Sequence, residues 1–135
     1  MSKVTKGAYG FTREVPLGYD AAIERVTATL KEQGFGVLTT IDVKDTLKKK
    51  IDRDFTRYAI LGACNPAFAI QALSAEIDIG LLMPCNVVVY ERPADGRTVV
   101  GILDPGTMVT LTGRADVEPL AKQVQGKLVA ALEAV

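Results

Sequence analysis

Apolar and polar residues follow two clear periodic patterns along the chain. Larger side chains alternate with small or polar ones from Ala8 to Val15, and this period of two predicts a first strand. Apolar residues then recur at helical spacing from Ala22 to Leu30, which predicts an amphipathic helix that ends at Gly34. The chain therefore begins with a strand and a helix.

Further strands and helices follow, and two of the strands are joined without a helix between them. Strands are predicted over residues 35–41, 55–63, 87–92 and 98–103, and a short extended piece over 107–111. A short charged helix is predicted over residues 42–54, and Asp116 is expected to cap the last helix. The dipeptide Asp95-Gly96, between the last two strands, is typical of a hairpin turn.

This order of elements predicts an α+β fold. Because a hairpin joins two strands while helices separate others, we expect a single, mostly antiparallel sheet with helices packed on one face, a two-layer sandwich. The chain has 135 residues, which suits a single domain over residues 1–135, with a flexible N-terminus over residues 1–7. The helices are too few to cover both faces of the sheet, so we expect a homodimer.

Each of the two cysteines is followed by an asparagine, and a proline lies beside each Cys-Asn pair. Cys64 and Asn65 precede an apolar run, and Cys85 and Asn86 follow it. Asn65 suits the N-cap of a helix, and the proline after it suits the first helical position, so a helix is predicted over residues 66–75. Because this helix is almost wholly apolar, we expect it to be buried.

The two Cys-Asn pairs are expected to meet at one end of the sheet, because the chain leaves the sheet after Cys64 and returns at Cys85. Cys64 then lies just outside a helix N-terminus, where the helix dipole favours anions and could lower the pKa of a thiol. With Asn65, Asn86 and the turn residue Asp104, the two cysteines are the candidate ligand-binding residues. We expect them to form a concave site that prefers a small anion.

Other roles for the cysteines stay open at this point. They could form a thiol pair for redox or sulfur-transfer chemistry. They could also be buried residues of a purely structural protein that acts only through its partners. They could bind a soft metal, but two thiolates without histidine fall short of the four ligands that zinc takes. Asp104, another carboxylate or a second subunit would have to complete such a site, so no metal ligand is assigned. No catalytic residue is identified.

Composition narrows the classes of function further. The chain has 16 Lys plus Arg, 16 Asp plus Glu, and no histidine. The balanced charge argues against nucleic acid and against an anionic membrane as partners, since both need a positive field. Without histidine, Ser-His-Asp and Cys-His catalysis are excluded within one chain. The first residues lack the apolar core of a signal peptide, so we expect a cytoplasmic protein, and no cofactor.

Several longer motifs resemble one known family. The family's pattern is matched at Leu61–Pro66 (Leu-Gly-Ala-Cys-Asn-Pro) and Gly80–Glu91 (Gly-Leu-Leu-Met-Pro-Cys-Asn-Val-Val-Val-Tyr-Glu), and also at Gly34–Val43 and Ile102–Pro105. These motifs resemble the bacterial and archaeal family known as domain of unknown function 302, over nearly the whole chain. The resemblance implies a compact, dimeric α+β domain, and it implies no activity.

Overall fold

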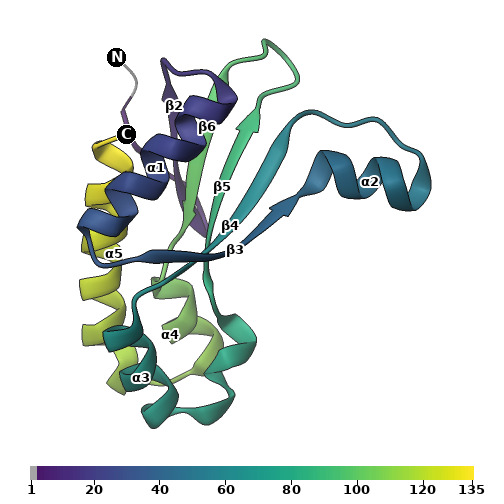
Figure 1. Cartoon of the computed structure of the whole chain (residues 1–135). Coiled ribbons are helices and arrows are strands. Elements are labelled where there is room, and N and C mark those ends of the chain that lie inside the picture. The colour runs from purple at the N-terminus through teal and green to yellow at the C-terminus, as the bar shows by residue number, and fades with distance from the viewer. Residues whose placement is uncertain (1–2) are drawn as a thin grey trace.

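Six antiparallel strands form the centre of the computed structural model, which describes residues 3–135 (Figure 1). Their order across the sheet is β1 (Thr5–Lys6), β2 (Gly10–Val15), β6 (Thr98–Leu103), β5 (Cys85–Glu91), β4 (Tyr58–Cys64) and β3 (Gly36–Asp42). The helices are α1 (Tyr19–Glu32), α2 (Val43–Ile51), α3 (Pro66–Ala75), α4 (Gly106–Thr112) and α5 (Glu118–Glu133), with 3-10 helices η1 (Ile77–Leu82) and η2 (Ala115–Val117). The predicted α+β fold with an antiparallel sheet is confirmed. Within residues 3–135, no helix is long and apolar enough to cross a membrane.

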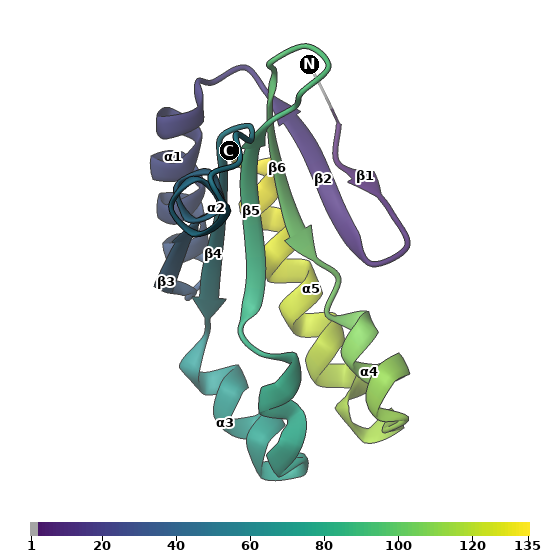
Figure 2. The ribbon, with the colours of Figure 1, turned by 90° about the vertical axis from the view of Figure 1, so that its right-hand side faces the viewer.

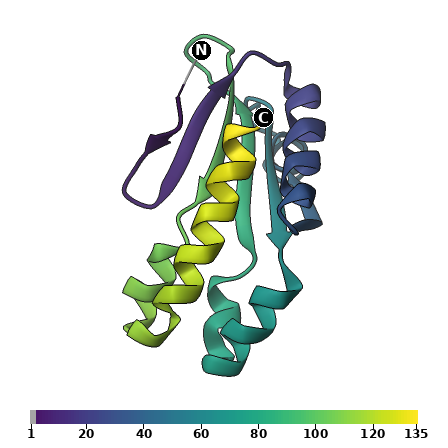
Figure 3. The same ribbon diagram turned by 90° about the vertical axis from the view of Figure 1, so that its left-hand side faces the viewer.

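Helices α1 and α5 cover one face of the sheet and form the hydrophobic core with it (Figure 3). Side chains alternate along a strand, so every second residue of β2, β4, β5 and β6 faces these helices. One such row across the sheet consists of Phe11, Ile102, Val87 and Leu61. Leu128 of α5 packs in the same core and is fully buried. The predicted alternation in these strands therefore marks the buried face correctly.

Two predicted turns are also confirmed. Gly34 follows the end of α1 with a φ of 85°, and Gly96 lies between β5 and β6 with a φ of 72°. Both values fall in the left-handed region, which glycine adopts without the steric cost that a Cβ brings. The glycine after the first helix and the Asp-Gly hairpin thus fix the direction of the chain at these two points.

One charged side chain lies on the buried face and joins the first long strand to the end of the chain. Arg13 of β2 is only 9% exposed. Its Nη1 donates to the backbone oxygens of Leu132 (3.1 Å), Glu133 (3.0 Å) and Val135 (2.9 Å). The oxygen of Leu132 also accepts from the backbone N of Val135 (3.3 Å). The guanidinium adds a charged donor at the end of α5, where carbonyls lack intrahelical partners. Arg13 therefore fixes the last turn of α5 to the sheet.

Two local predictions near α5 are wrong. Residues 107–111 form helix α4 and not an extended piece. Their β-branched residues favour a strand in isolation, but the Asp104 carboxylate accepts a hydrogen bond from the backbone N of Gly106 (2.8 Å) and starts a helical turn. Asp116 does not cap the last helix, because it lies in η2 and its carboxylate accepts from Arg114 (2.7 Å). Helix α5 begins at Glu118 without a side-chain cap.

Part of the segment predicted to be flexible belongs to the sheet. Thr5 pairs with Thr12 and Lys6 with Phe11, so β1 forms a short strand at one edge. A two-residue strand at an edge limits further pairing with other chains. Residues 1–2, which the same prediction includes, lie outside the described residues.

On the face of the sheet opposite α1 and α5, residues 3–135 place no helix flat against the strands. Figure 2 looks onto this face, where only α2 stands in front of the strands. Ile60, Val88 and Gly101 lie side by side across it. The rings of Tyr58 and Tyr90 stack beside them, with centroids 5.1 Å apart. These five residues define what we call the open face.

Helix α2 projects away from the body on the same side as the open face (Figure 1). Asp42 caps this helix by accepting a hydrogen bond from the backbone N of Asp45 (2.9 Å). None of its nine residues is buried, and Ile51 at its end is 61% exposed. A helix this short gains little from its own hydrogen bonds in water. Its apolar residues therefore remain available for packing against another molecule.

We expect Arg13 to contribute strongly to stability. Replacing Arg13 by Met keeps the apolar stem but leaves the backbone oxygens at the end of α5 without their charged donor. The free energy of unfolding should fall by about 2 kcal/mol, measured by urea denaturation. Arg25→Met is the matched control, because exposed Arg25 donates to the backbone oxygen of Ala134 (3.3 and 3.2 Å) and should cost less than about 1 kcal/mol. Equal losses in the two variants would contradict a special role for Arg13.

Candidate functional site

The first Cys-Asn pair marks the change from strand β4 to helix α3. Cys64 is the last residue of β4, and Asn65 is the N-cap of α3. The Oδ1 atom of Asn65 accepts hydrogen bonds from the backbone N of Ala67 (3.1 Å) and of Phe68 (3.4 Å). The predicted cap is confirmed, and such a cap contributes about 1 kcal/mol. A Cβ on Gly34 would lie 2.9 Å from Nδ2 of Asn65, so the bare glycine makes room for this amide.

Helix α3 itself is not buried, contrary to the prediction from its apolar sequence. Of the residues described in this helix, Ala72 alone is buried, and the side chain of Ile70 is 64% exposed. The helix lies beyond the end of the sheet, where one side faces α5 and the other faces solvent (Figure 1). A helix that is apolar all round has no preferred side. Its sequence could therefore not indicate which residues would be exposed.

The second Cys-Asn pair begins strand β5, as predicted. Cys85 is the first residue of β5 and lies opposite Ala63 of β4. A Cβ on Gly62 would lie 2.9 Å from Cγ of Pro84, so the proline ring packs directly on this glycine. Because Cys64 follows Ala63 and Cys85 lies opposite it, both cysteines stand at the same end of the sheet.

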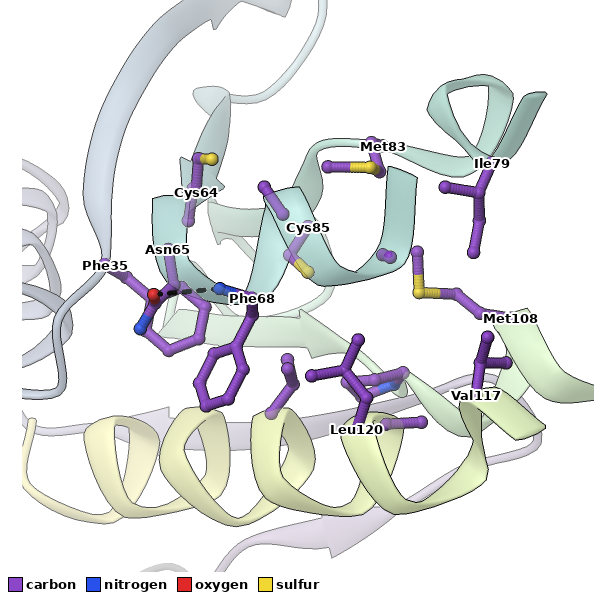
Figure 4. A pocket seen from close by; sticks show the side chains of 16 residues that line it. Phe35, Cys64, Asn65, Phe68, Ile79, Met83, Cys85, Met108, Val117 and Leu120 are labelled. Atoms are coloured by element: carbon purple, nitrogen blue, oxygen red, sulfur yellow. Dashed lines mark hydrogen bonds between the residues drawn. The ribbon is translucent and has the colours of Figure 1, made fainter. Parts of the chain in front are cut away.

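Both cysteines line one cavity between the end of the sheet and the helices α3, α4 and α5 (Figure 4). Its larger wall residues are apolar: Phe35, Phe68, Ile79, Met83, Met108 and Leu120. Among the described residues that line it, none is charged and Asn65 is the one amide. About 50 Å³ is open to the centres of water-sized molecules, several times the space that one water needs. The arrangement therefore forms a small apolar cavity.

The thiol groups of Cys64 and Cys85 point in different directions and do not form a disulfide. Cys64 and Cys85 are free and half-buried. Figure 4 shows the Cys85 sulfur directed to the cavity and the Cys64 sulfur directed away from it. Burial raises the pKa of the Cys85 thiol from 9.0 to about 11, and the nearby Cys64 acts in the same direction. At neutral pH, Cys85 is therefore a protonated thiol in an apolar surrounding.

The structure does not bring all five predicted site residues together. Cys64, Asn65 and Cys85 line the cavity, whereas Asn86 is exposed and lies with Val88 on the other side of the sheet. The reason is the alternation of side chains along a strand: Cys85 faces inward, so its neighbour faces outward. Asp104 is buried, and its Oδ1 accepts from Nε2 of Gln125 (3.0 Å) as well as from the backbone of α4. Its place is beside the cavity and not in its wall.

Sequence reasoning missed much of the cavity wall. Phe35, Phe68 and Leu120 come from three separate segments and carry no common motif. Met108 lies in α4, which was predicted as extended, so its place could not be inferred. Met83 could have been inferred to line the cavity, because it lies two residues before Cys85 in the sequence. Among the described residues, no group of three or more His, Cys, Asp or Glu could hold a metal ion.

Comparison with known proteins places this fold and its motifs in one family. The chain matches the family described as Domain of unknown function DUF302 over residues 11–135, and it belongs to that family. It is similar to a solved structure titled "Crystal structure of uncharacterized conserved protein DUF302 from Bacillus stearothermophilus". The TM-score is 0.88 at 30% sequence identity, over 95% of this chain and 98% of that chain. A search among curated proteins gives no match.

We expect the Cys85 thiol to react slowly in the folded protein. The Cys64→Ser variant leaves Cys85 as the one thiol to be labelled. Burial, the larger cause of the raised pKa of Cys85, is retained in this variant, so the thiolate fraction at pH 7 should rise by about tenfold or more on unfolding. Labelling with a chromogenic disulfide, with and without denaturant, measures this. Labelling of the native protein as fast as the denatured one would show that the thiol is not shielded.

Proposed function

We propose that this protein is a binding module for a small, apolar ligand, which it holds in the cavity beside Cys64 and Cys85. One observation supports this above all: the cavity wall contains no charged side chain and only one amide. Ligand sites are typically concave and mostly apolar, with a few polar groups that fix orientation. Asn65 and the Cys85 thiol are the polar groups that such a ligand would meet.

An anionic ligand, which the sequence favours, finds less support in the cavity. The N-terminal amides of α3 are the expected anion site, but Oδ1 of Asn65 already accepts from two of them. No lysine or arginine lines the wall to balance a negative charge. Transfer of an unpaired charge into such a site costs free energy. We therefore propose an apolar ligand in preference to an anion.

Thiol redox or sulfur transfer is the runner-up, and two observations weigh against it. A reactive cysteine needs a thiolate, and burial keeps Cys85 protonated. A dithiol mechanism also needs two sulfurs that face each other, whereas those of Cys64 and Cys85 point in different directions (Figure 4). The cavity offers neither a base nor a cation that would activate a thiol.

We further propose that the protein works as a homodimer in the cytoplasm. Two free cysteines suit a reducing compartment. The open face supports the dimer, because a sheet with one apolar, uncovered face gains stability when a symmetric copy covers it. Helix α2 projects on the same side and has no buried residue of its own, so a second copy on the open face would also contact this helix.

The ligand proposal is tested with benzene as an apolar probe and inorganic phosphate as an anionic one. Benzene should shift the amide NMR signals of Phe68 and Cys85, while phosphate should not. Ala69→Leu should weaken benzene binding because Ala69 lines the cavity. Ala67→Leu is the control on the same helix, because Ala67 is exposed and outside the wall. Shifts with phosphate alone, or equal effects of both variants, would contradict the proposal.

The dimer is tested by light scattering at micromolar concentration. The wild-type protein should have the mass of two chains. Val88→Lys places a charge in the middle of the open face and should give a monomer, because an interface core excludes charge. Ala28→Lys makes a similar change on the exposed side of α1 and should leave the dimer intact. A wild-type monomer, or dissociation by Ala28→Lys alone, would rule out this interface.

A further inference from the structure

The sulfur atoms of the protein are concentrated around the cavity. Apart from Met1, the chain has four sulfur-containing residues: Cys64, Met83, Cys85 and Met108. All four are among the 16 residues that line this one cavity, although the chain has 135 residues. They come from the end of β4, the segment before β5, the start of β5 and helix α4. The fold thus gathers them from three secondary-structure elements and one connecting segment.

Three of these sulfur atoms are directed to the cavity. Figure 4 shows the thioether sulfurs of Met83 and Met108 and the thiol sulfur of Cys85 facing this space, while Cys64 points away. Met83, Cys85 and Met108 are half-buried and not fully enclosed. Part of the surface of each residue is therefore exposed. Methionine also fills irregular gaps in cores, so an experiment has to separate packing from binding.

We propose that Met83, Cys85 and Met108 form a binding site for one soft monovalent cation, of which Cu(I) is the biological example. Thiolate and thioether ligands select soft ions such as Cu(I), whereas carboxylate and carbonyl ligands suit harder ions. One thiol and two thioethers are a soft donor set without a single oxygen ligand. Structural zinc takes four ligands, mostly thiolate and imidazole, and this set supplies one thiolate.

Charge also selects a monovalent ion. Binding exchanges the thiol proton for the cation: the S–H bond of Cys85 breaks, an S–Cu bond forms, and one proton leaves to solvent. No electron is transferred, and the net charge of the site is unchanged. A divalent ion in the same place would leave one uncompensated positive charge among apolar side chains, which is costly. The wall offers no acidic side chain that would balance it.

This inference goes beyond the proposed apolar ligand, and the two can be tested separately. Leucine has nearly the volume of methionine and is apolar, but it has no sulfur. Met83→Leu with Met108→Leu should therefore keep the cavity and its benzene binding, and such swaps usually cost less than about 1.5 kcal/mol of stability. Loss of cation binding with retained benzene binding would identify the thioethers as ligands.

The experiment uses the reduced Cys64→Ser protein, so that Cys85 is the one remaining thiol. Ag(I) in chloride-free buffer and Cu(I) supplied from a coloured chelator serve as the probes. Native mass spectrometry should find one ion per chain. Competition with the chelator should show at least about tenfold weaker binding in the Met83→Leu, Met108→Leu variant, since loss of even an outer-shell partner costs that much. Cys85→Ser should abolish competitive binding.

Two results would overturn the cation site. The first is an equal affinity of the methionine and leucine variants, which would show that the thiol alone binds the ion. The second is absence of a bound ion in the Cys64→Ser protein while benzene still shifts the cavity signals. In that case the proposal of an apolar ligand is supported and the proposal of a cation site is contradicted. If the cation binds but benzene does not, the cation site is supported and the proposal of an apolar ligand is contradicted.

Discussion

The packing of α5 along the sheet is the contact on which the rest of the structure depends. The C-terminal half of α5 buries Leu128 and Leu132 against the strands, and Arg13 holds the backbone oxygens at its end. The helix has 16 residues, and at 1.5 Å per residue it is about 24 Å long. It extends beyond the end of the sheet (Figure 3), so Leu120 and Ala121 in its first turns face the cavity and not the strands.

The cavity exists because residues with short side chains lie at the end of the sheet, beside the part of α5 that extends beyond the strands. Ala63 of β4, Ala69 and Ala72 of α3 and Ala121 of α5 all line it. Protein interiors are normally close-packed, with few voids larger than a water molecule. Larger residues at these positions would close the space, so the cavity reflects both the length of α5 and the choice of alanine around it. The sheet contributes only its last residues to the site.

The strands and their buried faces could be predicted because alternation has a direct physical cause in the pleat of a strand. The cap at Asn65 and the turns at Gly34 and Gly96 could also be predicted, since each depends on one residue and its neighbours. The site could be predicted only in part. Its wall joins residues from α3, α4 and α5 by tertiary packing, and no local pattern reports that packing. Asn86 shows why the sequence motif did not predict the whole site: Cys85 and Asn86 are adjacent in sequence, but their side chains lie on opposite faces of a strand.

The end of the molecule that closes the cavity is much less firmly packed than its sheet. Ala72 in α3, Ile79 in η1 and Val117 in η2 are the buried residues of these helices, and α4 has none. Regions with few buried apolar contacts open at a lower free energy than the whole domain. The backbone amides of α3 and α4 should therefore exchange their hydrogens by local opening, while those of β4, β5 and β6 exchange through global unfolding. One side of the cavity should thus be rigid while the other opens locally, so the proposed ligand would enter without loss of the native sheet.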